Sequence, residues 1–162
     1  MEETLDIVNK SIQQGEHIHH SVVNAGKIVL MQKDIQLRES VNNADIINAD
    51  GQAVVWASKV LNQPIKERVA GIDLMENLVE LAHEKGYKIY CLGAKEEIVS
   101  KVIQDYKKKY SDNLFAGYRN GYFFKEEERE IAKDIAQSGA NILFVAISSP
   151  KKENFHRENF PF

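Results

Sequence analysis

Short apolar runs alternate with amphipathic stretches along the 162 residues of the chain. Apolar runs of about four to eight residues suit buried strands, whereas apolar residues spaced three or four apart indicate helices. Strands that alternate with helices imply an α/β fold, here a Rossmann-like, mostly parallel sheet flanked by helices on both faces. Strands are predicted within 18–23, 46–47, 87–92, 114–118 and 142–147, and helices within 5–12, 27–42, 53–61, 73–86, 96–110 and 125–137.

Local signals predict the boundaries of one of these helices. Asp73 is expected to cap its start, because a carboxylate accepts the free backbone N–H groups of a first turn. Gly86 is expected to end it. The sequence contains no internal repeat, low-complexity tract or linker, so we expect a single domain over 1–162.

Composition excludes several classes of protein. A net charge of −3 offers no basic face for nucleic acid. The single cysteine, Cys91, excludes a disulfide framework and a cysteine-based zinc site, and its apolar surroundings predict an inert core residue. No apolar run reaches the roughly 20 residues of a membrane-spanning helix, so a cytoplasmic location is expected.

The order of elements indicates where a ligand binds. In open α/β sheets, ligands bind beyond the carboxyl ends of the strands. We therefore expect one rim to hold the polar and glycine residues that follow the predicted strands. These are Asn24, Asp50-Gly51, Gly93-Ala94, 118–122 and 148–152.

Each polar residue on this rim has two interpretations. Asp50 suits a general base towards a hydroxyl group or a turn carboxylate, and Gly51 beside it lets another group approach the backbone. Asn24 suits a sugar or phosphate contact or a turn. Arg68 suits a diphosphate clamp or a surface ion pair. Tyr122 suits stacking on a base or ordinary packing.

The glycine pattern excludes two familiar nucleotide sites. Gly93-Ala94 stands between a strand and a helix, where the free N–H groups of the helix favour an anion. Neither GxGxxG nor GxxxxGK[ST] is present, which argues against dinucleotide and P-loop enzymes. His17, His19 and His20 have no acidic or cysteine partner at metal-ligand spacing, so no metal site is expected.

Seven short stretches then resemble the bacterial WecG/TagA/CpsF glycosyltransferases in order and spacing, over about 17–155. They are Val22-Val23-Asn24-Ala25-Gly26-Lys27-Ile28-Val29, Asn48-Ala49-Asp50-Gly51, Glu67-Arg68-Val69-Ala70-Gly71-Ile72-Asp73-Leu74-Met75, Leu92-Gly93-Ala94, Gly121-Tyr122-Phe123, Leu143-Phe144-Val145-Ala146 and Pro150-Lys151-Lys152-Glu153. The resemblance implies transfer of N-acetylmannosamine or a related N-acetylhexosamine from a UDP-sugar. The implied acceptor is undecaprenyl-diphosphate-linked N-acetylglucosamine, in teichoic acid, common antigen or capsule synthesis.

The resemblance also implies roles for individual residues. Asp50 matches the proposed general base of an inverting displacement. Asn24 matches a substrate-contacting asparagine, Tyr122 matches a tyrosine near the uracil, and Gly93 lies in the nucleotide-side loop. No metal or other cofactor is implied, which leaves Arg68 and helix N-termini to stabilise the diphosphate. Self-association and peripheral contact with the inner face of the membrane are implied as well.

Three departures from the family pattern qualify these expectations. Val22 stands where the family often has threonine, and Lys152 where it often has glutamine. The lysine is expected to replace the glutamine's hydrogen bonds with a charge. The family's C-terminal segment is also expected to be missing. The alternative function is therefore a catalytically impaired core that acts as a binding or assembly subunit.

Overall fold

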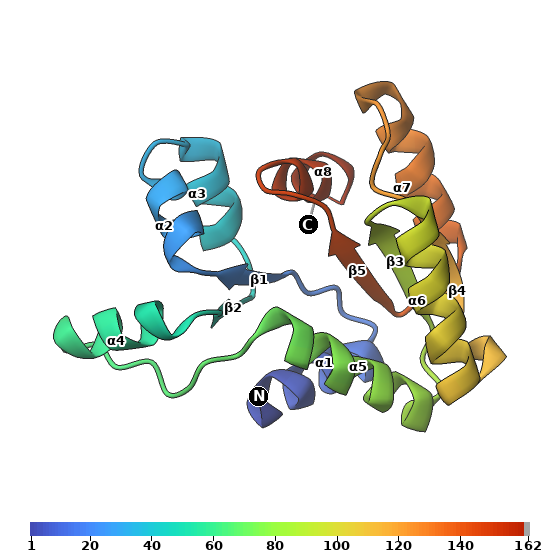
Figure 1. Ribbon diagram of the computed structural model, residues 1–162, viewed down its shortest axis with the longest axis horizontal. Helices are drawn as coiled ribbons and strands as arrows, with labels where there is room; N and C mark the ends of the chain where they lie inside the picture. Colours follow the sequence, from blue (N-terminus) through green and yellow to red (C-terminus); the bar gives the residue numbers. More distant parts are fainter. Residues whose placement is uncertain (161–162) are drawn as a thin grey trace. The chain divides into compact units, whose positions relative to one another are not determined.

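A computed structural model describes residues 1–160 of the chain, and Pro161 and Phe162 lie outside the described residues. The chain divides into two compact units, Met1–Asn77 and Leu78–Phe162 (Figure 1). Each unit contains parallel strands with helices packed on them, which confirms the predicted α/β class. The five predicted strands are all present, and they pair in two sheets, one of two strands and one of three.

The first unit is built on a two-stranded parallel sheet. Strands β1 (His20–Val23) and β2 (Ile46–Ala49) pair in register from His20 opposite Ile46 to Val23 opposite Ala49. Both strands therefore end at the same edge. The helices of this unit are α1 (Glu2–Gln14), α2 (Ala25–Met31), α3 (Ile35–Asn42), α4 (Gln52–Val60) and the start of α5 (Gly71–Lys85).

Two helix boundaries in this unit differ from prediction. The predicted helix over 27–42 is divided into α2 and α3, because the Asp34 carboxylate accepts a hydrogen bond from the Leu37 N–H (2.9 Å) and so starts a second helix. The prediction that Asp73 caps α5 is wrong. The helix already begins at Gly71, so Asp73 lies inside its first turn, where a negative charge still suits the helix dipole.

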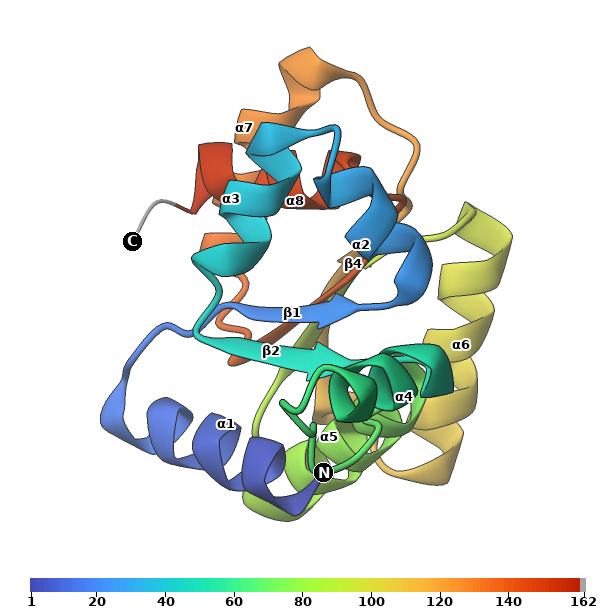
Figure 2. The ribbon, with the colours of Figure 1, turned by 90° about the vertical axis from the view of Figure 1, so that its left-hand side faces the viewer.

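The second unit is built on a three-stranded parallel sheet in the order β4-β3-β5. Its strands are β3 (Ile89–Gly93), β4 (Phe115–Arg119) and β5 (Ile142–Ala146). Its helices after α5 are α6 (Glu96–Lys109), η1 (Asp112–Leu114), η2 (Lys125–Glu127), α7 (Glu128–Gln137) and α8 (Lys151–Asn159). Helix α6 packs on β4, on the side of the sheet opposite to α7 (Figure 2).

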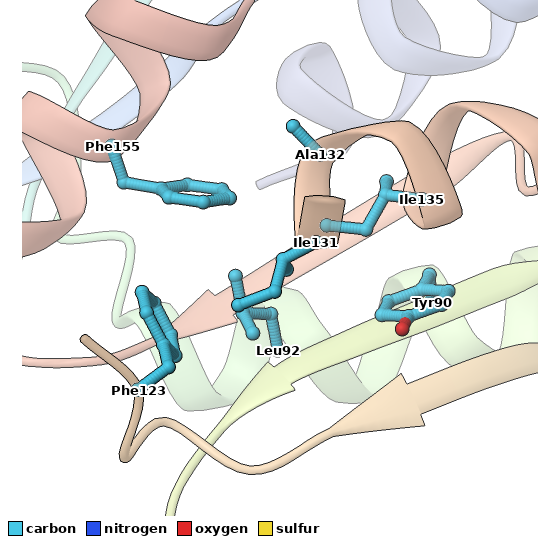
Figure 3. Close-up of a cluster of buried hydrophobic side chains, with 7 residues drawn as sticks. All are labelled: Tyr90, Leu92, Phe123, Ile131, Ala132, Ile135 and Phe155. Carbon is cyan, nitrogen blue, oxygen red and sulfur yellow. The ribbon is translucent and has the colours of Figure 1, made fainter. Parts of the chain in front are cut away.

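The central strand β3 supplies the core of this unit. Its residues are all buried, and alternate side chains point to opposite faces. Tyr90 and Leu92 face α7 and α8, where a cluster of buried side chains fills the space between sheet and helices (Figure 3). That cluster contains Tyr90, Leu92, Phe123, Ile131, Ala132, Ile135 and Phe155.

Cys91 lies on β3 between these two core residues and is buried. Burial in an apolar environment disfavours the charged thiolate and raises the pKa of the Cys91 thiol to about 12. The thiol is therefore protonated at neutral pH, which confirms the prediction of an inert core cysteine.

Ile131 tests how tightly this cluster is packed, because its side chain is only 2% exposed. We expect Ile131→Val to lower the free energy of unfolding by about 1 kcal/mol, since a buried methyl group is removed and the space is only partly refilled. Urea denaturation followed by circular dichroism measures the change. Ile98→Val on α6 is the matched control, because Ile98 is 49% exposed and the same deletion should change stability by less than about 0.5 kcal/mol. Equal effects of the two substitutions would contradict this description of the core.

Within residues 1–160, none of the helices is sufficiently long and apolar to cross a lipid bilayer.

Candidate functional site

The first group of predicted site residues follows the two strands of the first unit. Asn24 comes directly after β1, and Asp50 and Gly51 come directly after β2. The Asp50 N–H donates to the Val23 carbonyl (2.8 Å), so the two strand ends stay side by side. Gly51 has a φ of 129°, and a Cβ added to it would lie 3.8 Å from the Cβ of Asn24. The fold therefore brings these three residues together, as predicted from the carboxyl-end rule.

Asn24 has a local structural role. Its side-chain Oδ1 accepts a hydrogen bond from the Lys27 N–H (2.9 Å) and caps α2. This agrees with the turn interpretation, except that the helix begins at once with Ala25. The Asn24 side chain is nevertheless exposed, so its amide group faces solvent at the edge of the sheet.

A third segment reaches the same edge. The Val69 N–H donates to the Ala49 carbonyl (2.9 Å), which holds the chain after Arg68 against the end of β2. The Arg68 Nε atom then lies 3.6 Å from Asp50 Oδ1, and both side chains are partly exposed. An ion pair of this kind contributes little to stability. The contact matches the ion-pair interpretation of Arg68 and leaves much of its guanidinium open to other partners.

Asp50 has a second partner at the start of α5. The Gly71 N–H donates to Asp50 Oδ2 (3.4 Å), and a Cβ on Gly71 would lie 3.9 Å from Val22 and 4.0 Å from that same carboxylate oxygen. The Asp50 carboxylate is 35% exposed. It is thus held from two sides, by Arg68 and by a backbone N–H, while keeping a free face towards solvent. An oriented carboxylate of this kind can accept a proton from a hydroxyl group.

The second group of predicted site residues lies at the carboxyl edge of the sheet in the second unit. Gly93 ends β3 with a φ of 146°, and a Cβ on it would overlap the Ala146 carbonyl at the end of β5. The next residue, Ala94, donates its N–H to that carbonyl (3.2 Å) and accepts from the Gly121 N–H (2.9 Å). Three chain segments therefore meet closely here because two of them carry glycine.

A groove of about 520 Å³ opens beside this meeting point, which is within the usual size range of small-molecule sites. Tyr122 and Phe124 line it and are 71% and 79% exposed, although large aromatic side chains are usually buried. The other lining residues are Ala94, Gly121, Phe123, Ala146, Ile147, Ser148 and Lys151. A planar aromatic or base-like group fits such a surface.

Lys152, the predicted substrate contact, lies in the first turn of α8 with its N–H donating to the Ser148 carbonyl (3.2 Å). The neighbouring Lys151 is the lysine that lines the groove. Its Nζ atom donates to the carbonyl oxygens of Phe123 (2.9 Å) and Gly121 (3.4 Å). A substrate contact by Lys152 stays a prediction.

The two groups belong to different units. The structure brings Asn24, Asp50, Gly51 and Arg68 together in the first, and it brings Gly93 and Tyr122 together in the second. One rim shared by both groups stays a prediction. Sequence reasoning left Gly71 and Phe124 off the expected rim, although both contribute to these edges. Gly121 and Lys151 lie within the expected segments 118–122 and 148–152, but the sequence predicts no individual role for either.

Histidines contribute structurally in the part of the chain that the structure describes. The imidazole Nε2 of His20 lies 2.7 Å from the Asn48 side-chain oxygen, which ties the start of β1 to β2. Across residues 1–160, no three histidine, cysteine or carboxylate side chains gather as ligands for a metal ion.

Comparison with known proteins adds two findings. The sequence profile described as "Glycosyl transferase WecG/TagA/CpsF family" matches residues 1–161. A relative from Bacillus spizizenii, named N-acetylglucosaminyldiphosphoundecaprenol N-acetyl-beta-D-mannosaminyltransferase, is 34% identical over 124 residues. That match covers 75% of this chain and 48% of the relative, so the chain spans about half the length of the protein it matches.

Proposed function

Because the chain belongs to the WecG/TagA/CpsF glycosyltransferase family, we propose that it transfers an N-acetylmannosamine-like sugar from a UDP donor to a lipid-linked acceptor. The name of the Bacillus spizizenii relative supports polyprenyl-diphosphate-linked N-acetylglucosamine as the acceptor. The product would enter a cell-surface polysaccharide. A lipid-linked acceptor also requires the protein to work at the membrane surface.

The observation that carries this proposal is the groove with its exposed Tyr122 and Phe124. Aromatic side chains held on an ordered loop suit stacking against the uracil base of the donor. The N–H groups at the start of α6, which follows Gly93-Ala94, favour the negative charge of a diphosphate. No metal or other cofactor is assigned to this step, and Arg68 remains the proposed side-chain partner of the diphosphate.

Asp50 is the proposed general base. It would accept the proton of the acceptor hydroxyl group as that oxygen forms a bond to the anomeric carbon of the donor. The bond between the anomeric carbon and the diphosphate oxygen breaks in the same step, and UDP leaves with the electron pair. A single displacement inverts the anomeric configuration. Asn24 and Gly51, beside Asp50, would contact the sugars.

Tyr122→Ala tests the nucleotide site. We expect the Kd for UDP to rise about fivefold to 150-fold, because stacking on a base contributes about 1–3 kcal/mol. Isothermal titration calorimetry measures it. Tyr110→Ala is the control, since Tyr110 follows α6 and does not line the groove. Unchanged UDP affinity in Tyr122→Ala would show that the nucleotide binds elsewhere.

Transfer itself is tested with UDP-N-acetylmannosamine, UDP-N-acetylglucosamine and a soluble N-acetylglucosamine diphospholipid analogue. Release of UDP that depends on the acceptor supports the transferase. Donor binding without release supports the alternative of a catalytically impaired binding or assembly subunit. If neither sugar nucleotide binds, the transferase proposal fails and the alternative of a non-catalytic assembly subunit is favoured. Self-association, expected from the family resemblance, is measured separately by sedimentation.

A further inference from the structure

We propose that Lys151 is a positioning residue that clamps the groove loop, defined here as residues 120–124, and so holds Tyr122 and Phe124 ready for the base. The expected effect on ligand binding rests on the proposed nucleotide site. The clamp itself rests on contacts within the second unit alone.

Several hydrogen bonds hold the groove loop in place, although it exposes two aromatic side chains. The Tyr122 N–H donates to the Asn120 side chain (3.0 Å), and the Asn120 amide donates to Glu96 (3.0 Å). The Phe124 N–H donates to Glu127 (2.7 Å). Together with the bond from the Gly121 N–H to Ala94, these contacts satisfy three backbone donors of the loop.

Lys151 ties the loop from the carbonyl side. Its ammonium group donates to the carbonyl oxygens of Gly121 and Phe123, which flank Tyr122. The same Nζ atom lies 3.7 Å from the ring centroid of Phe123, a cation–π distance. Phe123 in turn is buried against Phe155, with ring centroids 5.8 Å apart (Figure 3). Lys151 thus holds the backbone on both sides of Tyr122. It also contacts the buried ring of Phe123, which lies in the sequence between the exposed Tyr122 and Phe124.

The position of Lys151 in the sequence is otherwise unfavourable. It is the first residue of α8, and a positive charge at a helix N-terminus opposes the helix dipole. Pro150 before it offers no side-chain cap. A residue that breaks a local rule is expected where a function compensates for it. The contacts to Gly121, Phe123 and the Phe123 ring supply that compensation.

A positioning role and a direct phosphate contact predict different ligand responses. If Lys151 positions the loop, its removal weakens binding of uridine and of UDP by the same factor, because both carry the base. If Lys151 contacts a phosphate, UDP binding weakens and uridine binding does not. The comparison therefore needs both ligands.

The experiment compares wild type with Lys151→Met, Lys151→Arg and the control Lys133→Met, an exposed lysine on α7. Hydrogen exchange measured by mass spectrometry reports on the loop without any ligand. We expect Lys151→Met to accelerate exchange across 119–127 about tenfold and to raise the Kd of uridine and UDP equally, about tenfold. Lys151→Arg, which keeps the charge and several donors, should keep loop exchange and ligand affinity close to those of the wild type.

Unchanged loop exchange in Lys151→Met would overturn the clamp, and a weakening of UDP binding alone would overturn the positioning role in favour of a phosphate contact. A wild-type chain that binds neither uridine nor UDP would overturn the proposed nucleotide site. In that case, accelerated loop exchange in Lys151→Met would still support the clamp.

Discussion

Asp50→Asn is expected to lower the rate of sugar transfer by about 10²- to 10⁴-fold, the usual contribution of a positioned general base. The asparagine is nearly isosteric and keeps an oxygen for the Gly71 N–H, but it cannot accept the proton of the acceptor hydroxyl group. The ion pair between Asp50 and Arg68 joins two partly exposed groups, so removing it should change stability by less than about 1 kcal/mol. The measurement is UDP release under saturating donor and acceptor, with thermal unfolding recorded in parallel.

Asp45→Asn is the matched control for this substitution. Asp45 precedes the same strand, β2, and accepts a hydrogen bond from the His19 N–H (2.7 Å) at the amino end of the sheet. The same chemical change is thus made at the opposite end of one strand, where no substrate is expected. If both variants keep the wild-type rate, Asp50 is not the base. If both lose activity together with stability, the effect on Asp50 is structural.

Gly93→Ala is expected to destabilise the second unit by more than about 4 kcal/mol, among the largest effects of a single substitution. The backbone of Gly93 has a φ of 146°, which L-residues with a side chain avoid. The added Cβ would also overlap the Ala146 carbonyl, a backbone atom that cannot turn away, and it would lie 2.7 Å from the Ala146 Cα. Urea denaturation followed by circular dichroism measures the decrease.

Gly139→Ala separates the cost of a positive φ from the cost of steric overlap. Gly139 also has a positive φ, 73°, but a Cβ on it would meet nothing within 4 Å. We expect this variant to be destabilised by only about 1 kcal/mol, the cost of a left-handed conformation. A Gly93→Ala protein as stable as Gly139→Ala would mean that β3 and β5 do not approach each other as closely as the structure shows.

The helices and strands could be predicted from the sequence largely because their signals are local. The apolar runs that form β3 and β5 are continuous and bounded by glycine or proline, so length and pattern identify them without tertiary information. The break between α2 and α3 escapes prediction because Asp34 acts through a single side-chain hydrogen bond inside a stretch with helical spacing. The start of α5 escapes it for a related reason, since glycine, its first residue, gives no sequence signal for a helix start.

The site could be predicted in part because several of its residues directly follow predicted strands. Asn24, Asp50 and Gly51 follow strands, and parallel strands place their carboxyl ends at one edge. Gly71 and Lys151 act through contacts with residues more than 20 positions away along the chain. The carboxyl-end rule places Lys151 in the expected segment 148–152, but neither spacing nor composition predicts these contacts. Gly121 lies in the expected rim segment 118–122, but its close approach to the end of β3 depends on the three-dimensional fold and could not be predicted.

The burial of Cys91 has a practical consequence for measuring ligand binding at the groove by fluorescence. The chain has one thiol, and that thiol is enclosed in the core and protonated at neutral pH. A fluorescent maleimide should therefore leave the folded wild-type protein unlabelled. A cysteine introduced at exposed Phe124 would carry the dye alone, giving an optical signal from the groove without first removing the native thiol.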